Sequence, residues 1–187
     1  MEHKEKKKQS LTYNRLITYM PTFRHGNDNF VFESGIDFDV LNKYLERNND
    51  LLLLKFHINT KIDRNAFAGY KNIKFVHEKE NPYDLICETD LLITDYSSIA
   101  YDYLLLDRPI IYYPFDLDQY KNTDRAMYTE YDEFVAGPVV ETFDDLLTTL
   151  FNDEDLKKSL QSQRKSEIWG EKVIGCFTVF KTKLLEC

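Results

Sequence analysis

The amino-acid sequence predicts an α/β fold built on a Rossmann-like, doubly wound parallel sheet. Short apolar runs alternate along the chain with segments of helical periodicity, which is the pattern of repeated strand–helix–strand units. One run, Leu51–Leu54, consists of four leucines, and continuous apolar runs are typical of strands covered on both faces of a parallel sheet. A length of 187 residues is sufficient for one such domain and too short for two sizeable ones.

The apolar runs predict five strands, most of them closed by a polar or turn-forming residue. The expected strands are Leu16–Met20, Leu51–Phe56, Ile73–Val76, Asp90–Thr94 and Pro109–Tyr113. Helices are expected where a capping residue or proline precedes spaced apolar positions: Asp37 to about Arg47, Pro82–Cys87, after Ser97 or Ser98, Thr142–Phe151, from Asp153, and Lys172–Leu185. The segment Phe115–Pro138 shows little periodicity, so we expect a long functional or mobile loop there.

The charge balance argues against a nucleic-acid-binding protein. The formal net charge is −8, and the concentrated basic run is Lys4–Lys8, whereas nucleic-acid binding requires a basic face. Charged blocks of this kind usually form solvated tails. We therefore expect a charged lead-in over residues 1–14 and a single domain over residues 15–187. The alternative for the basic run is weak contact with anionic lipid.

The cysteines and the chain ends indicate a cytoplasmic protein. The three cysteines, Cys87, Cys176 and Cys187, match no metal-binding spacing and no disulfide framework. A reducing compartment is the simplest explanation. No stretch reaches the length of a transmembrane span, and the polar N-terminus is unlike a secretory signal.

The turn Asp95–Ser98 is the strongest local signal for a binding site. Ligands of doubly wound sheets bind outside the carboxyl ends of the strands, and this turn follows an expected strand and opens a helix. Free backbone N–H groups and the helix dipole make such a turn an anion site. The hydroxyls of Ser97 and Ser98 add donors. The alternative interpretation is a plain helix cap.

Basic residues that follow other strands could meet the same anion. Lys55 and His57 end the leucine strand and could contact a diphosphate, His57 as a charge or a hydrogen-bond donor. Arg24 and Arg125 are candidates for bidentate phosphate contact. The alternative for each is an ordinary solvated side chain. His25 and His77 are weaker candidates, because most such residues are surface histidines.

Two D-x-D triplets, Asp37–Asp39 and Asp116–Asp118, are of the kind that can hold Mg²⁺ against a diphosphate. Each stands where a helix should start, so capping explains both triplets more simply, and we expect no metal site and no cofactor. The sequence contains no G-x-x-x-x-G-K-[ST], G-x-G-x-x-G or G-x-S-x-G motif. Their absence counts against P-loop, classical dinucleotide-binding and hydrolase functions.

Five ordered pieces of the sequence together resemble a known family. They are Ile17–Arg24, Lys55–His57, Leu91–Tyr103, Arg108–Tyr113 and Tyr131–Val140. In this combination the chain resembles the CDP-glycerol glycerophosphotransferases, the polymerases and primases of wall teichoic acid. The third piece followed by the aromatic strand and the Gly137–Pro138 segment is the most specific part of the resemblance.

The resemblance implies the C-terminal, donor-binding half of a GT-B fold. The donor would be CDP-glycerol or another CDP-alditol such as CDP-ribitol, and the acceptor a polyol-phosphate chain at the inner face of the plasma membrane. By the same resemblance, His57, Ser97 and Ser98 would face the donor diphosphate, Asp95 would shape the turn, and Arg24 would lie at the cleft edge.

The chain departs from the family pattern in two places. Ile58 stands where the family usually has proline after the histidine. This difference affects the expected shape of the local turn more than the expected role of the imidazole. The family's catalytic base is expected in a Trp–His–Gly-like segment of the N-terminal domain, and this sequence has none. We therefore expect the N-terminal GT-B domain to be absent and the isolated chain to be inactive.

The resulting hypothesis is a transferase domain that binds a CDP-alditol, transfers polyol phosphate and releases CMP. One alternative is a GT-B glycosyltransferase domain that uses a nucleotide sugar. A second alternative is a truncated nucleotide-binding module without activity. The tyrosine-rich surface would pack on the missing domain or on another copy of the chain, and peripheral membrane contact is left open.

Overall fold

Five parallel strands form one sheet with the spatial order β3-β2-β1-β4-β5. The computed structural model describes residues 13–123, 130–152, 156 and 161–169. The strands are β1 (Leu16–Tyr19), β2 (Leu51–Leu54), β3 (Ile73–Phe75), β4 (Leu91–Thr94) and β5 (Ile110–Tyr112). All five predicted strands are confirmed, each within two residues of the expected bounds, and the strand order is that of the Rossmann fold.

Alternate residues of the strands pack into two hydrophobic cores, one on each face of the sheet. Ile17, Leu52 and Ile93 belong to one core, whereas Leu92 and Ile110 belong to the other. Successive side chains of a strand point to opposite faces, so a strand that is apolar throughout stabilises both cores at once. The leucine run of β2 therefore has the explanation that the sequence predicted.

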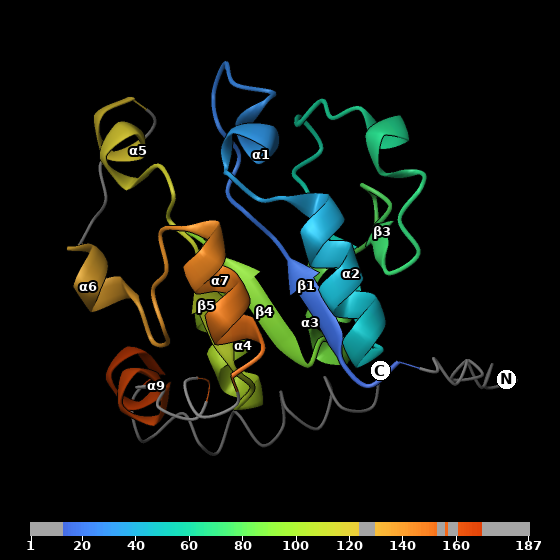
Figure 1. Ribbon diagram of the computed structural model, residues 1–187. Coiled ribbons are helices and arrows are strands. Elements are labelled where there is room, and N and C mark those ends of the chain that lie inside the picture. The colour runs from blue at the N-terminus through green and yellow to red at the C-terminus, as the bar shows by residue number, and fades with distance from the viewer. Residues whose placement is uncertain (1–12, 124–129, 153–155, 157–160, 170–187) are drawn as a thin grey trace, which may run out of the picture.

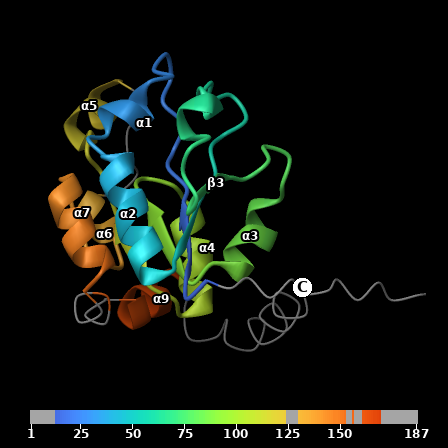
Figure 2. The same ribbon diagram turned by 45° about the vertical axis from the view of Figure 1, so that its right-hand side comes forward.

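Helices cover both faces of the sheet, as a doubly wound fold requires. Figures 1 and 2 show α2 (Phe38–Asn48) and α7 (Phe143–Leu150) on one face, and α3 (Pro82–Glu88) and α4 (Ile99–Tyr103) on the other. The 3₁₀ helix η2 (Leu104–Leu106) continues α4, and α9 (Gln161–Trp169) lies near its end. The predicted fold class is confirmed.

Three of the predicted helix starts are confirmed by side-chain caps. Asp37 accepts from the backbone N–H of Val40, Asn81 precedes Pro82 and accepts from Tyr83, and Thr142 accepts from Asp145. Each cap satisfies one of the otherwise unpaired N–H groups of a first helical turn. The D-x-D triplet at Asp37 is thus a helix cap.

The expected loop at Phe115–Pro138 is wrong in part, because two short helices lie in it. These are α5 (Leu117–Thr123) and α6 (Tyr131–Phe134). Their apolar contacts are mostly aromatic and too few to give a helical period in the sequence. Two further short helices were not predicted: α1 (Phe30–Glu33) and the 3₁₀ helix η1 (Arg64–Phe67). Residues 1–12, the helix start at Asp153 and the last predicted helix lie outside the described residues.

The segment after α6 extends the sheet at its β5 edge. The backbone N–H of Tyr112 donates to Pro138 at 2.8 Å, and Val140 donates to Tyr112 at 2.9 Å. Gly137 makes this approach close, since a Cβ at this position would lie 2.2 Å from the carbonyl oxygen of Ile110. Only glycine fits such a contact without displacing the backbone. The Gly–Pro segment therefore completes the fold at this edge.

Candidate functional site

A cavity of about 690 Å³ opens at the carboxyl edge of the sheet. We call it the rim pocket; its walls are the segments that follow β1, β2, β3 and β4, with Tyr83 of α3 and Tyr120 of α5. The order β3-β2-β1-β4-β5 reverses direction between β1 and β4. Such a reversal opens the crevice in which doubly wound folds bind their ligands. The pocket thus lies where the fold class predicts a binding site.

Two serine hydroxyls face the rim pocket and take no part in capping α4. Ser97 and Ser98 line the pocket, and the start of α4 has no side-chain cap hydrogen bond. The alternative interpretation of this turn as a plain side-chain cap is therefore wrong. The hydroxyls are left to donate to a ligand.

His57 lies on another wall of the rim pocket, beside Phe23. Its imidazole is exposed and stands 5.3 Å from the Phe23 ring, centroid to centroid, and Nδ1 accepts from the backbone N–H of Asn59 at 3.2 Å. This bond leaves Nε2 as the nitrogen that can donate to a ligand. His57 therefore meets the same pocket as the two serines, as predicted from its place after β2.

Lys55 also lines the rim pocket, but its ammonium group is engaged by the protein. The side chain is buried, and Nζ donates to the carbonyl oxygen of Glu78 at 2.9 Å. Burial lowers the pKa of Lys55, an effect that the charges of Glu80 and Glu78 partly offset. Glu78 and Glu80 also line the pocket, and the carboxylate of Glu78 is paired with Arg64. Lys55 thus links the segment after β2 to the segment after β3. A contact between Lys55 and phosphate stays a prediction.

An acid from α4 also lines the rim pocket. Asp102 lies one helical turn after Ser98, and both line the rim pocket. Burial raises the pKa of Asp102, and a hydrogen bond from Tyr83 offsets part of the rise. Residues four apart share one helix face, so Asp102 belongs to the same pocket wall as Ser98. Sequence reasoning missed Asp102, although its spacing from Ser98 was a usable signal.

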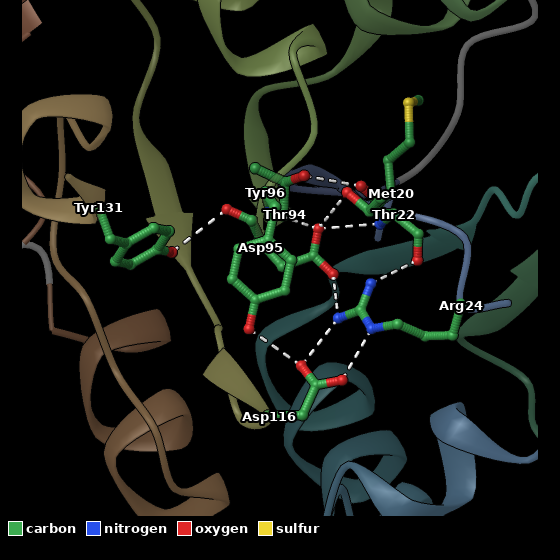
Figure 3. A network of polar contacts seen from close by, with 8 residues as sticks. All are labelled: Met20, Thr22, Arg24, Thr94, Asp95, Tyr96, Asp116 and Tyr131. Atoms are coloured by element: carbon green, nitrogen blue, oxygen red, sulfur yellow. Dashed lines mark hydrogen bonds and ion pairs between the residues drawn. The ribbon is translucent and has the colours of Figure 1, made fainter. Parts of the chain in front are cut away.

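The turn that carries the serines is held by a buried network around Asp95 (Figure 3). One carboxylate oxygen of Asp95 accepts from Thr22, from its backbone N–H at 2.8 Å and its hydroxyl at 2.7 Å, and from the backbone of Tyr96. The other oxygen accepts from the Arg24 guanidinium at 2.8 Å. Asp95 is fully buried. It fixes the turn after β4 to the segment after β1.

Arg24 bridges Asp95 to Asp116, as Figure 3 shows. Its Nε and Nη2 donate to the two carboxylate oxygens of Asp116 at 2.7 and 2.9 Å, and Nη1 donates to the carbonyl oxygen of Thr22 at 2.7 Å. Asp116 also accepts from the hydroxyl of Tyr96 at 3.0 Å. The second D-x-D triplet therefore stands at the start of α5, as predicted, and its Asp116 also supplies an ion-pair partner to Arg24.

The Arg24 side chain is only 2% exposed and is enclosed by aromatic rings. Its guanidinium carbon lies 4.8 Å from the Tyr120 ring and 4.9 Å from the Tyr96 ring, and these two rings stack at 4.1 Å. Burial alone would lower the pKa of Arg24, but the hydrogen bond to Asp116 and the two carboxylate charges raise it overall. A direct contact with phosphate would require this guanidinium to leave both carboxylates. The geometry assigns Arg24 to the framework beneath the site.

The remaining predicted residues divide into two groups. Arg125 lies outside the described residues. His77 follows β3 and is exposed, but it does not line the rim pocket. His25, which the sequence ranked as a surface histidine, does line it. Asp116 was marked only as part of a D-x-D triplet and Tyr120 had no motif, because their partners Arg24 and Tyr96 lie 20 or more residues away in the sequence.

A second cavity, of about 410 Å³, lies on the other side of Asp116. Its walls include Glu33, Asp116, Asp118 and Glu141, and none of its lining residues in the described part of the chain is basic. Such a lining repels phosphate. Among the residues that the structure describes, no group of three histidine, cysteine or acidic side chains is placed to hold a metal ion.

An open parallel sheet with a pocket at its switch point defines the class of Rossmann-like domains, and in this chain hydroxyl and imidazole groups line that pocket. Comparison with known proteins narrows the class. Residues 4–172 match the model of the CDP-glycerol:poly(glycerophosphate) glycerophosphotransferase family. The chain belongs to this family, as its sequence pieces indicated.

Curated relatives and solved structures agree with this assignment. The teichoic acid ribitol-phosphate polymerase TarL of Staphylococcus aureus is 38% identical over 144 residues, which cover 75% of this chain and 25% of TarL. A teichoic acid poly(glycerol phosphate) polymerase of Staphylococcus epidermidis is 36% identical, with 67% and 18% covered. This chain thus spans about a quarter or less of the length of these two relatives.

Structures of the wall teichoic acid polymerase TagF superpose on nearly the whole chain. One has a TM-score of 0.66 at 28% identity and covers 94% of this chain and 44% of TagF. A TagF variant soaked with CDPG gives a TM-score of 0.65 at 27% identity. A putative UDP-N-acetylglucosamine 2-epimerase from Listeria monocytogenes, 16% identical with a TM-score of 0.54, shares the fold alone.

Proposed function

We propose that residues 15–187 form the donor-binding domain of a CDP-alditol phosphotransferase of teichoic acid synthesis, and that the rim pocket holds the donor. The observation that carries the proposal is the pair of hydroxyls at Ser97 and Ser98. They make no capping hydrogen bond to α4, and they line the pocket together with His57. Membership of the glycerophosphotransferase family and the likeness to TagF support the choice of a CDP-alditol.

In the proposed reaction a hydroxyl of the acceptor attacks the β-phosphorus of the donor. A new oxygen–phosphorus bond forms, the bond from that phosphorus to the bridging oxygen breaks, and CMP leaves with the electron pair. Hydrogen bonds from Ser97, Ser98 and His57 would stabilise the charge that spreads over the phosphoryl oxygens. The proton of the attacking hydroxyl goes to a base that we place in an N-terminal GT-B domain outside this sequence.

The proposal also names partners and a location. The acceptor is a polyol-phosphate chain, because the curated relatives are teichoic acid polymerases and transferases. Such an acceptor, carried on a lipid, would bring the protein to the inner face of the plasma membrane from the cytoplasm. Among the described helices, none combines the length and the apolar character needed to cross a membrane. Peripheral contact and association with another copy of the chain are further parts of this hypothesis.

Calorimetric titration of the chain with CDP-glycerol and CDP-ribitol tests the proposal. At least one of them should bind, and the double substitution Ser97→Ala with Ser98→Ala should weaken binding by about 1–3 kcal/mol, the scale of hydrogen bonds to charged groups. The matched control is Ser166→Ala, an exposed serine of α9 outside the pocket, which should bind normally. Tight binding of a UDP-sugar with none for either CDP-alditol would overturn the proposal in favour of a glycosyltransferase.

A further inference from the structure

Among the residues that the structure describes, three basic side chains line the rim pocket: His25, Lys55 and His57. Lys55 is buried and donates to a backbone carbonyl, so the two exposed imidazoles provide most of the basic surface. Three acids, Glu78, Glu80 and Asp102, also line the pocket, and the carboxylate of Glu78 is paired with Arg64. A diphosphate therefore meets less repulsion near the histidines than near Glu80 and Asp102.

Both imidazoles pack against the same aromatic ring, that of Phe23. The centroid of Phe23 lies 5.1 Å from that of His25 and 5.3 Å from that of His57. The His25 ring meets Phe23 edge-on and the His57 ring is tilted to it, an arrangement that stabilises each ring in place. Phe23 thus holds side chains from two distant segments beside one cavity.

The backbone that carries His25 is anchored by its neighbour. Arg24 lies between Phe23 and His25 in the chain, and its side chain is held by Asp95 and Asp116 in the interior. Because Asp95 also fixes the turn at Ser97, one buried network sets the positions of the histidine wall and the serine wall. Such preorganisation lowers the cost of ordering groups around a ligand.

We propose that His25 is a second imidazole of the donor site, and that His25 and His57 together bind the diphosphate of the donor across Phe23. This inference rests on the proposed function and adds a phosphate-binding residue to it. An imidazole contributes an N–H donor in its neutral form and a charged donor when protonated. The glycerol or ribitol and the nucleoside would then extend from the histidines toward the other pocket walls.

The test compares His25→Asn with His77→Asn in the full 187-residue chain. His77 is the matched control: like His57, it follows a strand, is exposed, and accepts at Nδ1 from the backbone N–H two residues on. Affinities for CDP-glycerol, CDP and cytidine are measured by calorimetry. His25→Asn should weaken CDP-glycerol and CDP roughly tenfold, the scale of one hydrogen bond to a charged group, and leave cytidine unchanged. His77→Asn should change none of the three.

Several outcomes separate this inference from the proposed function. Unchanged CDP-glycerol affinity in His25→Asn, with the serine double variant weakened, overturns the role of His25 and leaves the proposed function standing. Equal losses for CDP and cytidine also overturn it, because the contact would then be to the nucleoside. Failure of the unsubstituted chain to bind any CDP-alditol overturns the proposed function itself. Thermal unfolding of each variant, together with His25→Lys as a variant that supplies another N–H donor, distinguishes lost contact from lost structure.

Discussion

Arg24 and His25 are neighbours in the sequence, yet they belong to two regions with opposite physical character. Arg24 is 2% exposed and makes four hydrogen bonds to Thr22, Asp95 and Asp116. His25 is exposed and lines the rim pocket. The first region is an ionic framework in the interior, and the second is a polar surface around a cavity.

The difference shows how side chains that can rotate, such as the serines and histidines of the rim pocket, are held at fixed positions relative to one another. Histidine and serine side chains at a pocket wall are positioned precisely for a ligand only when the backbone that carries them is fixed. In this chain the fixing is done by charges that never reach the pocket, so loss of a framework group should affect stability first. Loss of a pocket group should affect ligand binding alone.

The largest effect expected from breaking this division is that of Arg24→Met. The substitution leaves the buried carboxylate of Asp95 and its neighbour Asp116 without their cation, which costs about 3–5 kcal/mol of unfolding free energy. Urea unfolding measures this loss. His25→Asn is the control and should remain within about 0.5 kcal/mol of the unsubstituted chain. A destabilisation of similar size in both variants would contradict the separation of framework and pocket.

A smaller effect is expected for Thr22→Val, which removes one donor to Asp95. The hydroxyl of Thr22 donates to this fully buried carboxylate at 2.7 Å, so its removal should cost about 1–3 kcal/mol of unfolding free energy. Thr22→Ser keeps the hydroxyl and should recover most of the stability. If valine and serine variants unfold at the same urea concentration, Asp95 does not depend on this donor.

The smallest framework effect is expected for Tyr131→Phe. The hydroxyl of this buried tyrosine of α6 donates to the carbonyl oxygen of Asp95 at 3.2 Å, a neutral hydrogen bond worth about 0.5–1.5 kcal/mol. Thermal unfolding should detect the loss, whereas Tyr44→Phe, on an exposed face of α2, should leave the midpoint unchanged. Equal midpoints in both variants would place α6 outside the framework.

The sheet could be predicted from the sequence because its determinants are local. A buried parallel strand needs a short apolar run, and the sequences of β2 and β4 contain such runs. The caps at Asp37 and Thr142 are equally local. The helices α5 and α6 could not be predicted, since they are held by aromatic contacts such as that of Tyr120 with Tyr96, which depend on the finished fold.

The site divides along the same line. The positions of His57, Ser97 and Ser98 follow from the rule that ligands bind at the carboxyl ends of strands, and all three line the rim pocket. Arg24 also follows the carboxyl end of a strand, but its side chain points into the interior because it pairs there with the carboxylates of Asp95 and Asp116. Strand position predicts where a residue lies but not which way a long side chain turns. That choice depends on partners from distant segments.

The glycine that lets the Gly–Pro segment approach β5 has a consequence for how copies of the protein meet. The outer strand of any sheet exposes backbone donors and acceptors that invite pairing with another chain. Here the N–H and carbonyl groups of Tyr112 are taken by Pro138 and Val140, and the proline itself has no N–H to offer in turn. A side chain at Gly137 would lift this cover from β5. The glycine therefore lets the Gly–Pro segment cover backbone groups of β5 that would otherwise be open to pairing with a second copy.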